Sequence, residues 1–130
     1  MWLEHDERRA QVIETIVLNY MKSNLSVPVL MEQPQVPSED FPTVPEQYIV
    51  IEKVAGDITD HIRSATFAFQ SYSTKSLYEA AALDEMVQGV MDDMAANVPE
   101  VSESSMTADT NFTDTSTKRY RYQCLYNIFY

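Results

Sequence analysis

The last segment of the chain combines aromatic and basic side chains in a pattern that could bind nucleic acid. Tyr120, Tyr122 and Tyr126 are interleaved with Arg119 and Arg121. Aromatic rings beside basic groups on a strand can stack on single-stranded nucleotides. However, the chain has twenty Asp and Glu against nine Lys and Arg, a net charge of −11, and phosphate binding requires a basic surface. We therefore expect this segment to serve in core packing and subunit contacts.

The sequence contains no motif typical of a zinc site or of a nucleotide-binding loop. The two histidines, His5 and His61, are far apart and have no nearby cysteine or carboxylate at motif spacing, so we expect no zinc site. Only two glycines are present, Gly56 and Gly89. Because a phosphate-cradling loop and a dinucleotide fingerprint each need several glycines, nucleotide enzymes are excluded.

The remaining candidates for catalysis have simpler structural explanations. Asp92 and Asp93 are adjacent, and neighbouring residues on a helix point about 100° apart, so a solvated helix end explains them better than an acid–base pair. The single cysteine, Cys124, lies among aromatic residues, and we expect it to be a buried apolar group. We predict that the protein is not an enzyme and has no catalytic residues, cofactor or metal.

A long interval of the chain carries only negative charge. Residues 76–117 contain nine Asp or Glu and no Lys or Arg. A solvated acidic face that keeps the protein soluble is one interpretation, and a functional electrostatic field is the other.

The first half of the chain predicts a helix, a stiff loop and two strands. Residues 6–25 have apolar side chains at helical spacing. Residues 28–47 contain five of the six prolines, so we expect a proline-rich loop with a possible short strand at VLMEQ. This loop is either a binding arm or a plain exposed loop. Strands are predicted over 48–55 and 61–72, joined by a turn that starts at Ala55-Gly56-Asp57.

The strand over 61–72 and the helix after it supply the predicted core. Phe67 and Phe69 lie on one face of that strand. Ser76 and Glu79 form a capping-box pattern at the start of a helix that should end near Asn97.

The second half of the chain ends in two further predicted strands. The acidic polar segment 98–117 should contain an outer strand around 100–110, and residues 118–130 alternate as a final strand. The whole sequence predicts one α+β domain over residues 1–130, with a mostly antiparallel or mixed sheet of about four strands and two helices packed on one face.

The order of these segments resembles that of the tail terminator, or tail completion, proteins of long-tailed, siphovirus-type bacteriophages. The resemblance rests on the first helix, on YIVIEKVAG, on ATFAFQSYSTKSLYEAAALDEMVQGVMDDM and on NFTDTSTKRYRYQCLYNIFY. It covers nearly the whole chain as order and pattern, without an invariant catalytic motif. Members of the family typically have an aspartate, a polar turn, and an arginine and tyrosine that open a final hydrophobic strand. Here these residues would be Asp114, Thr115 to Thr117, Arg121 and Tyr122.

The resemblance implies a structural role in the virion tail. Such proteins form a ring, usually a hexamer, that caps the major tail tube protein, stops polymerisation and offers a surface to the head connector or stopper protein. Assembly would take place in the host cytoplasm, without a membrane. We expect subunit contacts from Asp114, Arg119, Arg121 and Tyr122. We expect Arg119 or Arg121 to form charged contacts either with a neighbouring subunit or with a carboxylate of the same chain, for which Asp114 is a candidate.

DNA would pass through such a ring without specific binding, because an acidic lumen repels phosphate. The acidic residues that we expect to line the channel are Glu79, Asp84, Glu85, Glu100, Glu103 and Asp109. Two alternatives are a head-completion or stopper protein of the connector and, from another class, a small acidic inhibitor that mimics DNA.

Overall fold

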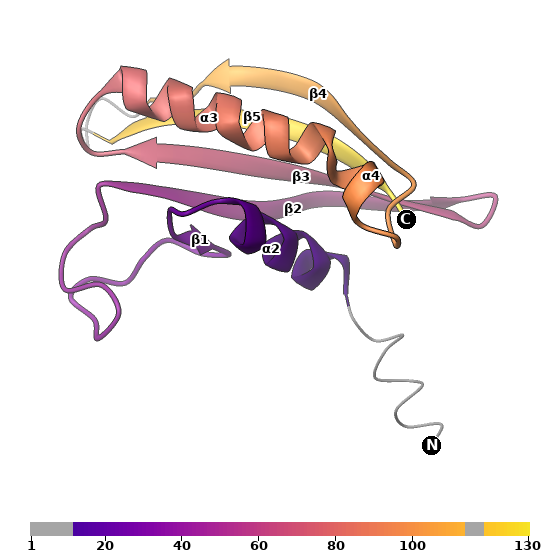
Figure 1. The fold of residues 1–130 in the computed structure, drawn as a ribbon, viewed down its shortest axis with the longest axis horizontal. Helices are drawn as coiled ribbons and strands as arrows, with labels where there is room; N and C mark the ends of the chain where they lie inside the picture. The colour runs from indigo at the N-terminus through magenta and orange to yellow at the C-terminus, as the bar shows by residue number, and fades with distance from the viewer. Residues whose placement is uncertain (1–11, 114–118) are drawn as a thin grey trace.

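The computed structural model describes residues 12–113 and 119–130 and has the expected α+β architecture (Figure 1). The elements in chain order are α2 (Ile13–Asn24), β1 (Val29–Leu30), β2 (Gln47–Thr59), β3 (Ile62–Ser73), α3 (Leu77–Asp92), α4 (Met94–Asn97), β4 (Glu103–Asn111) and β5 (Tyr120–Phe129). In the described part of the chain, no helix is long and apolar enough to span a bilayer.

The strands form one mixed sheet in the order β1-β2-β3-β5-β4. Strand β1 pairs with β2 in parallel through two residues, and the other neighbours are antiparallel. The sequence predicted about four strands; the fifth is β1, which lies inside the expected VLMEQ segment. The final strand therefore does not end the sheet, because β5 inserts between β3 and β4.

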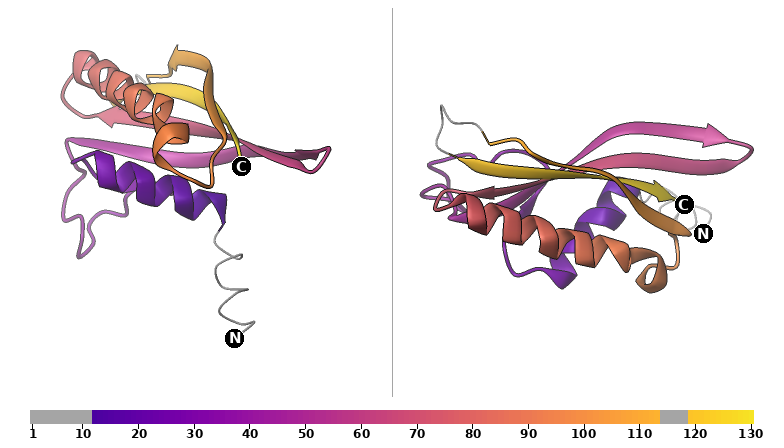
Figure 2. Two further views of the ribbon diagram at one scale, coloured as in Figure 1. Left: turned by 45° about the vertical axis from the view of Figure 1, so that its right-hand side comes forward. Right: turned by 90° about the horizontal axis from the view of Figure 1, so that it is seen from above.

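Helices α2 and α3 both pack on one face of the sheet, as expected (Figure 2). The core between them and the sheet includes Phe67 and Phe69 of β3, and the predicted core face of that strand is confirmed. Cys124 and Tyr126 of β5 are fully buried in the same cluster. Tyr126 lies edge-on to Phe69, with 6.0 Å between the ring centroids. Burial of these rings supplies much of the hydrophobic stabilisation.

The helix predicted up to Asn97 is divided into α3 and α4. It begins as expected, because the Ser76 hydroxyl accepts a hydrogen bond from the Glu79 N–H at 3.1 Å. Helix α3 ends at Asp92, and the N–H of Asp93 bonds to the Met91 carbonyl before α4 begins. The first helix, predicted over residues 6–25, is observed over Ile13–Asn24; residues 6–11 lie outside the described residues.

The turn predicted at Ala55-Gly56-Asp57 is wrong. Strand β2 continues through Gly56, which pairs with Ala65 of β3, and a register shift next to it marks a β-bulge. A glycine inside a strand often accompanies a bulge, so the same residue was compatible with both structures. The chain reverses at Asp60 and His61, whose φ angles of 51° and 67° are those of a two-residue type I′ turn.

We predict that Phe67→Ala strongly destabilises the protein. Phe67 is fully buried, and truncation of a buried phenylalanine typically costs about 3–5 kcal/mol because it leaves a cavity. Urea denaturation measures the change in the free energy of unfolding. Ile62→Ala, on the same strand but 56% exposed, is the matched control and should change stability by less than about 0.5 kcal/mol. Equal effects of the two substitutions would contradict the placement of the core.

Candidate functional site

The sheet face opposite the helices carries a cluster of tyrosine, glutamine and arginine side chains. The strand register places Tyr48, Tyr72 and Arg121 side by side on β2, β3 and β5. Each is separated from the buried core positions of its strand by an odd number of residues, so its side chain points away from the helices. We call this group, together with Gln33 and Arg119, the Tyr–Arg cluster.

The two tyrosines form the rigid centre of the Tyr–Arg cluster. The rings of Tyr48 and Tyr72 are stacked, with centroids 4.7 Å apart and planes 8° apart. Gln33, from the proline-rich loop, donates to the Tyr72 hydroxyl at 2.8 Å and accepts from the Tyr48 hydroxyl at 3.1 Å. Burial raises the pKa of Tyr48 above its ordinary value, although nearby Arg119 opposes this shift. The amide therefore ties the loop to the sheet through two hydroxyl groups.

Both arginines attach to these hydroxyls. Arg121 Nη1 donates to the Tyr72 hydroxyl at 3.1 Å, and Arg119 Nη1 donates to the Tyr48 hydroxyl at 3.3 Å. The Arg121 guanidinium also lies 5.7 Å from the ring centroids of Tyr72 and Phe112. An arginine has five N–H donors, and each of these two arginines donates only one of them to a tyrosine hydroxyl. The arrangement therefore holds two guanidinium groups in place for a carboxylate or another acceptor.

The same face continues as rows of neutral polar side chains. Gln70 donates to Gln123 at 3.3 Å across β3 and β5, and Thr66 donates to Asn127 farther along the same strands. These four side chains thus pair with one another within the chain. Beside them, Tyr48, Val50 and Tyr72 form a small buried apolar cluster with Leu30 and Val44.

The predicted interface residues fall into two places. Arg119 and Arg121 lie together in the Tyr–Arg cluster, and neither has a carboxylate partner in the described part of the chain. Tyr122 points to the opposite, helix-covered side and pairs in register with Ser71. Asp114 lies outside the described residues, so the expected contact with an arginine stays a prediction.

The alternation predicted for the final strand is confirmed, and it separates the aromatic residues from the bases. Tyr126 is fully buried on the helix side, whereas Arg121 is on the other face. The pattern that suggested base stacking therefore does not form one surface. The arginines meet Tyr48 and Tyr72 instead. Nothing in the sequence indicated Tyr48, Tyr72 or Gln33 as their partners.

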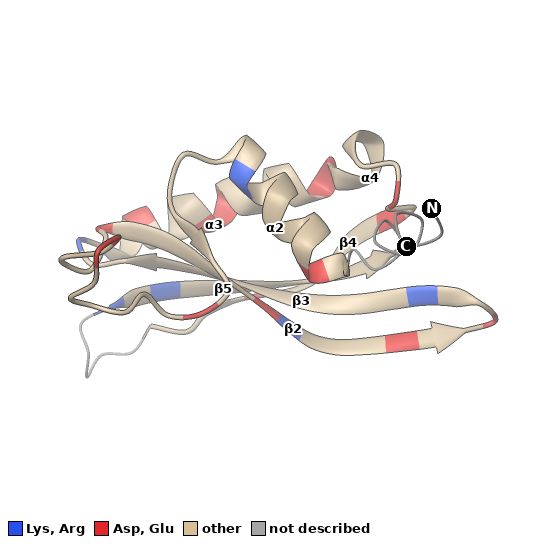
Figure 3. Cartoon of the chain, turned by 90° about the horizontal axis from the view of Figure 1, so that it is seen from below, with Lys and Arg blue, Asp and Glu red and all other residues tan. Residues whose placement is uncertain are grey.

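The six predicted channel residues lie on α3, in the turn after α4 and on β4; Figure 3 marks acidic residues along α3 in red. Glu79 is partly buried and accepts from Gln47 at 2.9 Å. Exposed positions are held by Glu85, Glu100, Glu103 and Asp109.

Asp84 differs from the other five because it is only 1% exposed and so contributes to no surface of the single chain. Its Oδ2 accepts from Gln88 at 2.9 Å, and its Oδ1 has no hydrogen-bond partner in the described residues. Burial, and then the Asp109 carboxyl group facing it from β4, raise the pKa of Asp84 to about 7. Both effects disfavour the charged form.

Two further titratable groups lie in this buried region. Burial, with Asp84 as the next cause, raises the pKa of the Cys124 thiol. A thiol that stays protonated is a poor nucleophile, and the expectation that Cys124 is buried is confirmed. Burial also raises the pKa of Tyr126, whose hydroxyl donates to Asp92 at 2.8 Å.

Within residues 12–113 and 119–130, no three His, Cys, Asp or Glu side chains gather as metal ligands. Comparison with known proteins gives no family assignment. No family model matches the chain, and no curated protein gives a significant sequence match.

We predict that Asp84 makes stability fall as the pH rises. Because its folded pKa is above its unfolded value, its contribution is complete below about pH 4 and is lost as the pH rises through about 7. Between pH 5 and 8 the free energy of unfolding should fall by about 2 kcal/mol more in the wild type than in Asp84→Asn. Denaturation curves at a series of pH values measure this difference. Glu85→Gln is the neighbouring exposed control and should follow the wild type; parallel curves for Asp84→Asn would contradict the assignment.

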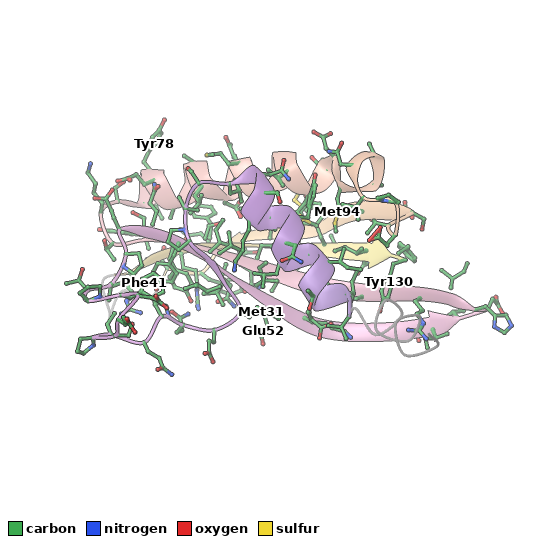
Figure 4. All side chains as sticks on the ribbon, turned by 60° about the horizontal axis from the view of Figure 1, so that its bottom comes forward. Met31, Phe41, Glu52, Tyr78, Met94 and Tyr130 are labelled. Carbon is green, nitrogen blue, oxygen red and sulfur yellow. The ribbon has the colours of Figure 1, made fainter. Side chains whose placement is uncertain are left out.

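The hydroxyl group of Tyr72 should contribute measurably to stability. It accepts from Gln33 and Arg121 and donates to Gln70, and Tyr72 is 6% exposed. Tyr72→Phe leaves these groups without their partner and should cost about 1–3 kcal/mol. Tyr78→Phe is the control, because Tyr78 is 81% exposed and points away from the sheet (Figure 4). If thermal unfolding gave the same result for both variants, the hydroxyl network would have no energetic role.

Proposed function

We propose that this protein is a structural subunit of a bacteriophage tail that forms a ring on the end of the tail tube. The ring would stop polymerisation and provide the surface for joining the head. Two lines of reasoning support the proposal: the sequence resemblance to tail terminator proteins and a fold whose free surfaces suit repeated association. The second line rests on the sheet, which has unpaired edges in the described residues.

The free edges carry most weight in this proposal. Strand β4 is the last strand of the sheet, and β1 covers only two residues of β2. Unpaired strand edges present backbone donors and acceptors that another chain can use. When two different surfaces of one chain meet head to tail, the assembly closes into a ring if the rotation allows it.

The charge distribution supports a passage for DNA. Glu85, Glu100, Glu103 and Asp109 are exposed in a chain of net charge −11. If these residues face the lumen of a ring, the negative potential repels phosphate and allows DNA to slide through. Asp84 is not part of this proposal, since its side chain is buried.

The Tyr–Arg cluster supports a subunit or partner contact. Its two guanidinium groups are held by tyrosine hydroxyls on a face that also carries the amides of Gln70 and Gln123. An acidic chain gains most from such a pair when it meets a carboxylate of a neighbouring copy or of the tube protein.

A head-completion or stopper protein would use the same kinds of surface but would bind the connector instead of the tube. A DNA-mimicking inhibitor would present carboxylates to a DNA-binding protein and need not form a ring. Electron microscopy of the purified protein mixed with its cognate tail tubes distinguishes these cases. We expect a terminal ring on each capped tube and shorter tubes when the protein is present during polymerisation. Bare tube ends and unchanged tube lengths would refute the proposal.

We predict that Arg121→Glu weakens ring formation on tubes. The substitution removes the guanidinium held by Tyr72 and Phe112 and places a negative charge where an acidic partner is expected. Lys22→Glu makes the same change in charge at an exposed position on α2 and should leave capping intact. The fraction of capped tube ends is counted by microscopy, with urea denaturation as a check on folding. If Arg121→Glu folded and capped tubes as well as the wild type, the assigned contact would be wrong.

A further inference from the structure

The β2–β3 hairpin extends beyond the body of the molecule. Every residue from 52 to 63 is exposed, and Figures 1 and 2 show this part of β2 and β3 projecting past the other elements. We call residues 52–63 the arm. Strand β5 pairs with β3 only from Ser64 onward, and β1 pairs with β2 only at Ile49 and Val50. The outer edge of β2 along the arm therefore has no neighbouring strand in the described residues.

The arm exposes apolar side chains to solvent. Val54, Ile58 and Ile62 are 49%, 64% and 56% exposed. Large β-branched side chains favour strands but gain little from burial when they stand on a projecting hairpin. A strand with an open edge and exposed isoleucines fits the addition of a further strand, in which backbone hydrogen bonds and apolar contacts are made together.

The arm is also less acidic than residues 76–117, the segment that contains β4. It contains three acids, Glu52, Asp57 and Asp60, and two bases, Lys53 and Arg63; Figure 3 shows both kinds on the hairpin. By contrast, residues 76–117 have nine acids and no base. The arm can thus approach an acidic surface with less repulsion than a second copy of residues 76–117 could.

The opposite edge of the sheet supplies such a surface. Strand β4 has a partner on one side only, and most of its residues are exposed, including Met106 at 45%. Its charged residues are Glu103 and Asp109. A β-bulge between Met106 and Ala108 leaves short regular runs on each side of it.

We propose that the arm of one copy of this chain pairs along β4 of the next copy, so that the sheet continues from subunit to subunit. The inference rests on the proposed function, since it supplies the head-to-tail contact that a ring needs. Ile58 of β2 then gains an apolar partner in Met106, and the open backbone edges of β2 and β4 supply each other with hydrogen-bond donors and acceptors. A symmetric contact between two β4 strands would instead bring like charges together, which is unfavourable. The occupant of β4 is therefore the arm of a second copy.

Cross-linking between two single-cysteine variants tests the contact. One protein carries Ile58→Cys and the other, with a mass tag, carries Met106→Cys or Ala108→Cys; the native Cys124 is buried. Because each protein carries only one of the two introduced cysteines, a cross-link between these sites joins two chains. The probe is a short bismaleimide, which tolerates small differences in register. Tyr78→Cys, on the exposed side of α3, replaces the β4 cysteine in the control.

We expect tagged heterodimers of the arm and β4 variants to form about ten times faster than with the Tyr78→Cys control, because association raises the local thiol concentration. The variant Ile58→Asp should lose oligomers in sedimentation while keeping its thermal stability, and Met86→Asp on α3 should keep both its oligomers and its thermal stability. Cross-linking at the control rate, or only between two arms or two β4 strands, would overturn this inference. If tubes were capped by rings without the arm–β4 cross-link, this contact alone would be wrong. If the cross-link formed but no tube were capped, the proposed function would fail and the contact would stand.

Discussion

The structure depends on one constraint: both long helices cover the same face of the sheet. Phe67 and Phe69 of β3 and Tyr126 of β5 pack there with residues of α2 and α3, and all three rings are fully buried. The hydrophobic effect rewards this main interface, and a smaller apolar cluster of Tyr48, Val50 and Tyr72 lies on the other face. The polar groups of that face and of the two edges are satisfied in other ways. The surfaces with a possible role in assembly are those that the helices leave uncovered.

On the sheet face that the helices leave uncovered, polar side chains form hydrogen bonds with one another. Tyr48, Tyr72 and Gln33 join the proline-rich loop to the sheet, and the two arginines attach to the same hydroxyls. A buried hydroxyl group costs free energy unless it is paired, so the cluster fixes side chains that would otherwise be mobile. The arginines are consequently held by neutral partners, which leaves their charge available to a carboxylate.

Under the helices, Asp84 is the exception to an apolar core. Its buried carboxyl group lies against Cys124 and faces Asp109 from β4. A charge there is costly, so the protonated form is favoured. The contact ties α3 to β4, the edge strand that we assign to subunit contact, and it makes the stability of that edge depend on protonation.

Much of the fold followed from the sequence by itself. Alternating residues in β3 and β5 and helical spacing in α3 predicted the elements and their buried faces, since period and burial are local properties of the chain. The turn at Asp60 and His61 was missed because neither residue is a glycine and Gly56 offered a stronger local signal. Only the tertiary structure decided that β5 inserts between β3 and β4, that Arg119 and Arg121 meet Tyr48 and Tyr72, and that Asp84 is buried opposite Asp109. These relations join residues 25 to 71 positions apart, and strand order and register, which no local pattern encodes, bring them together.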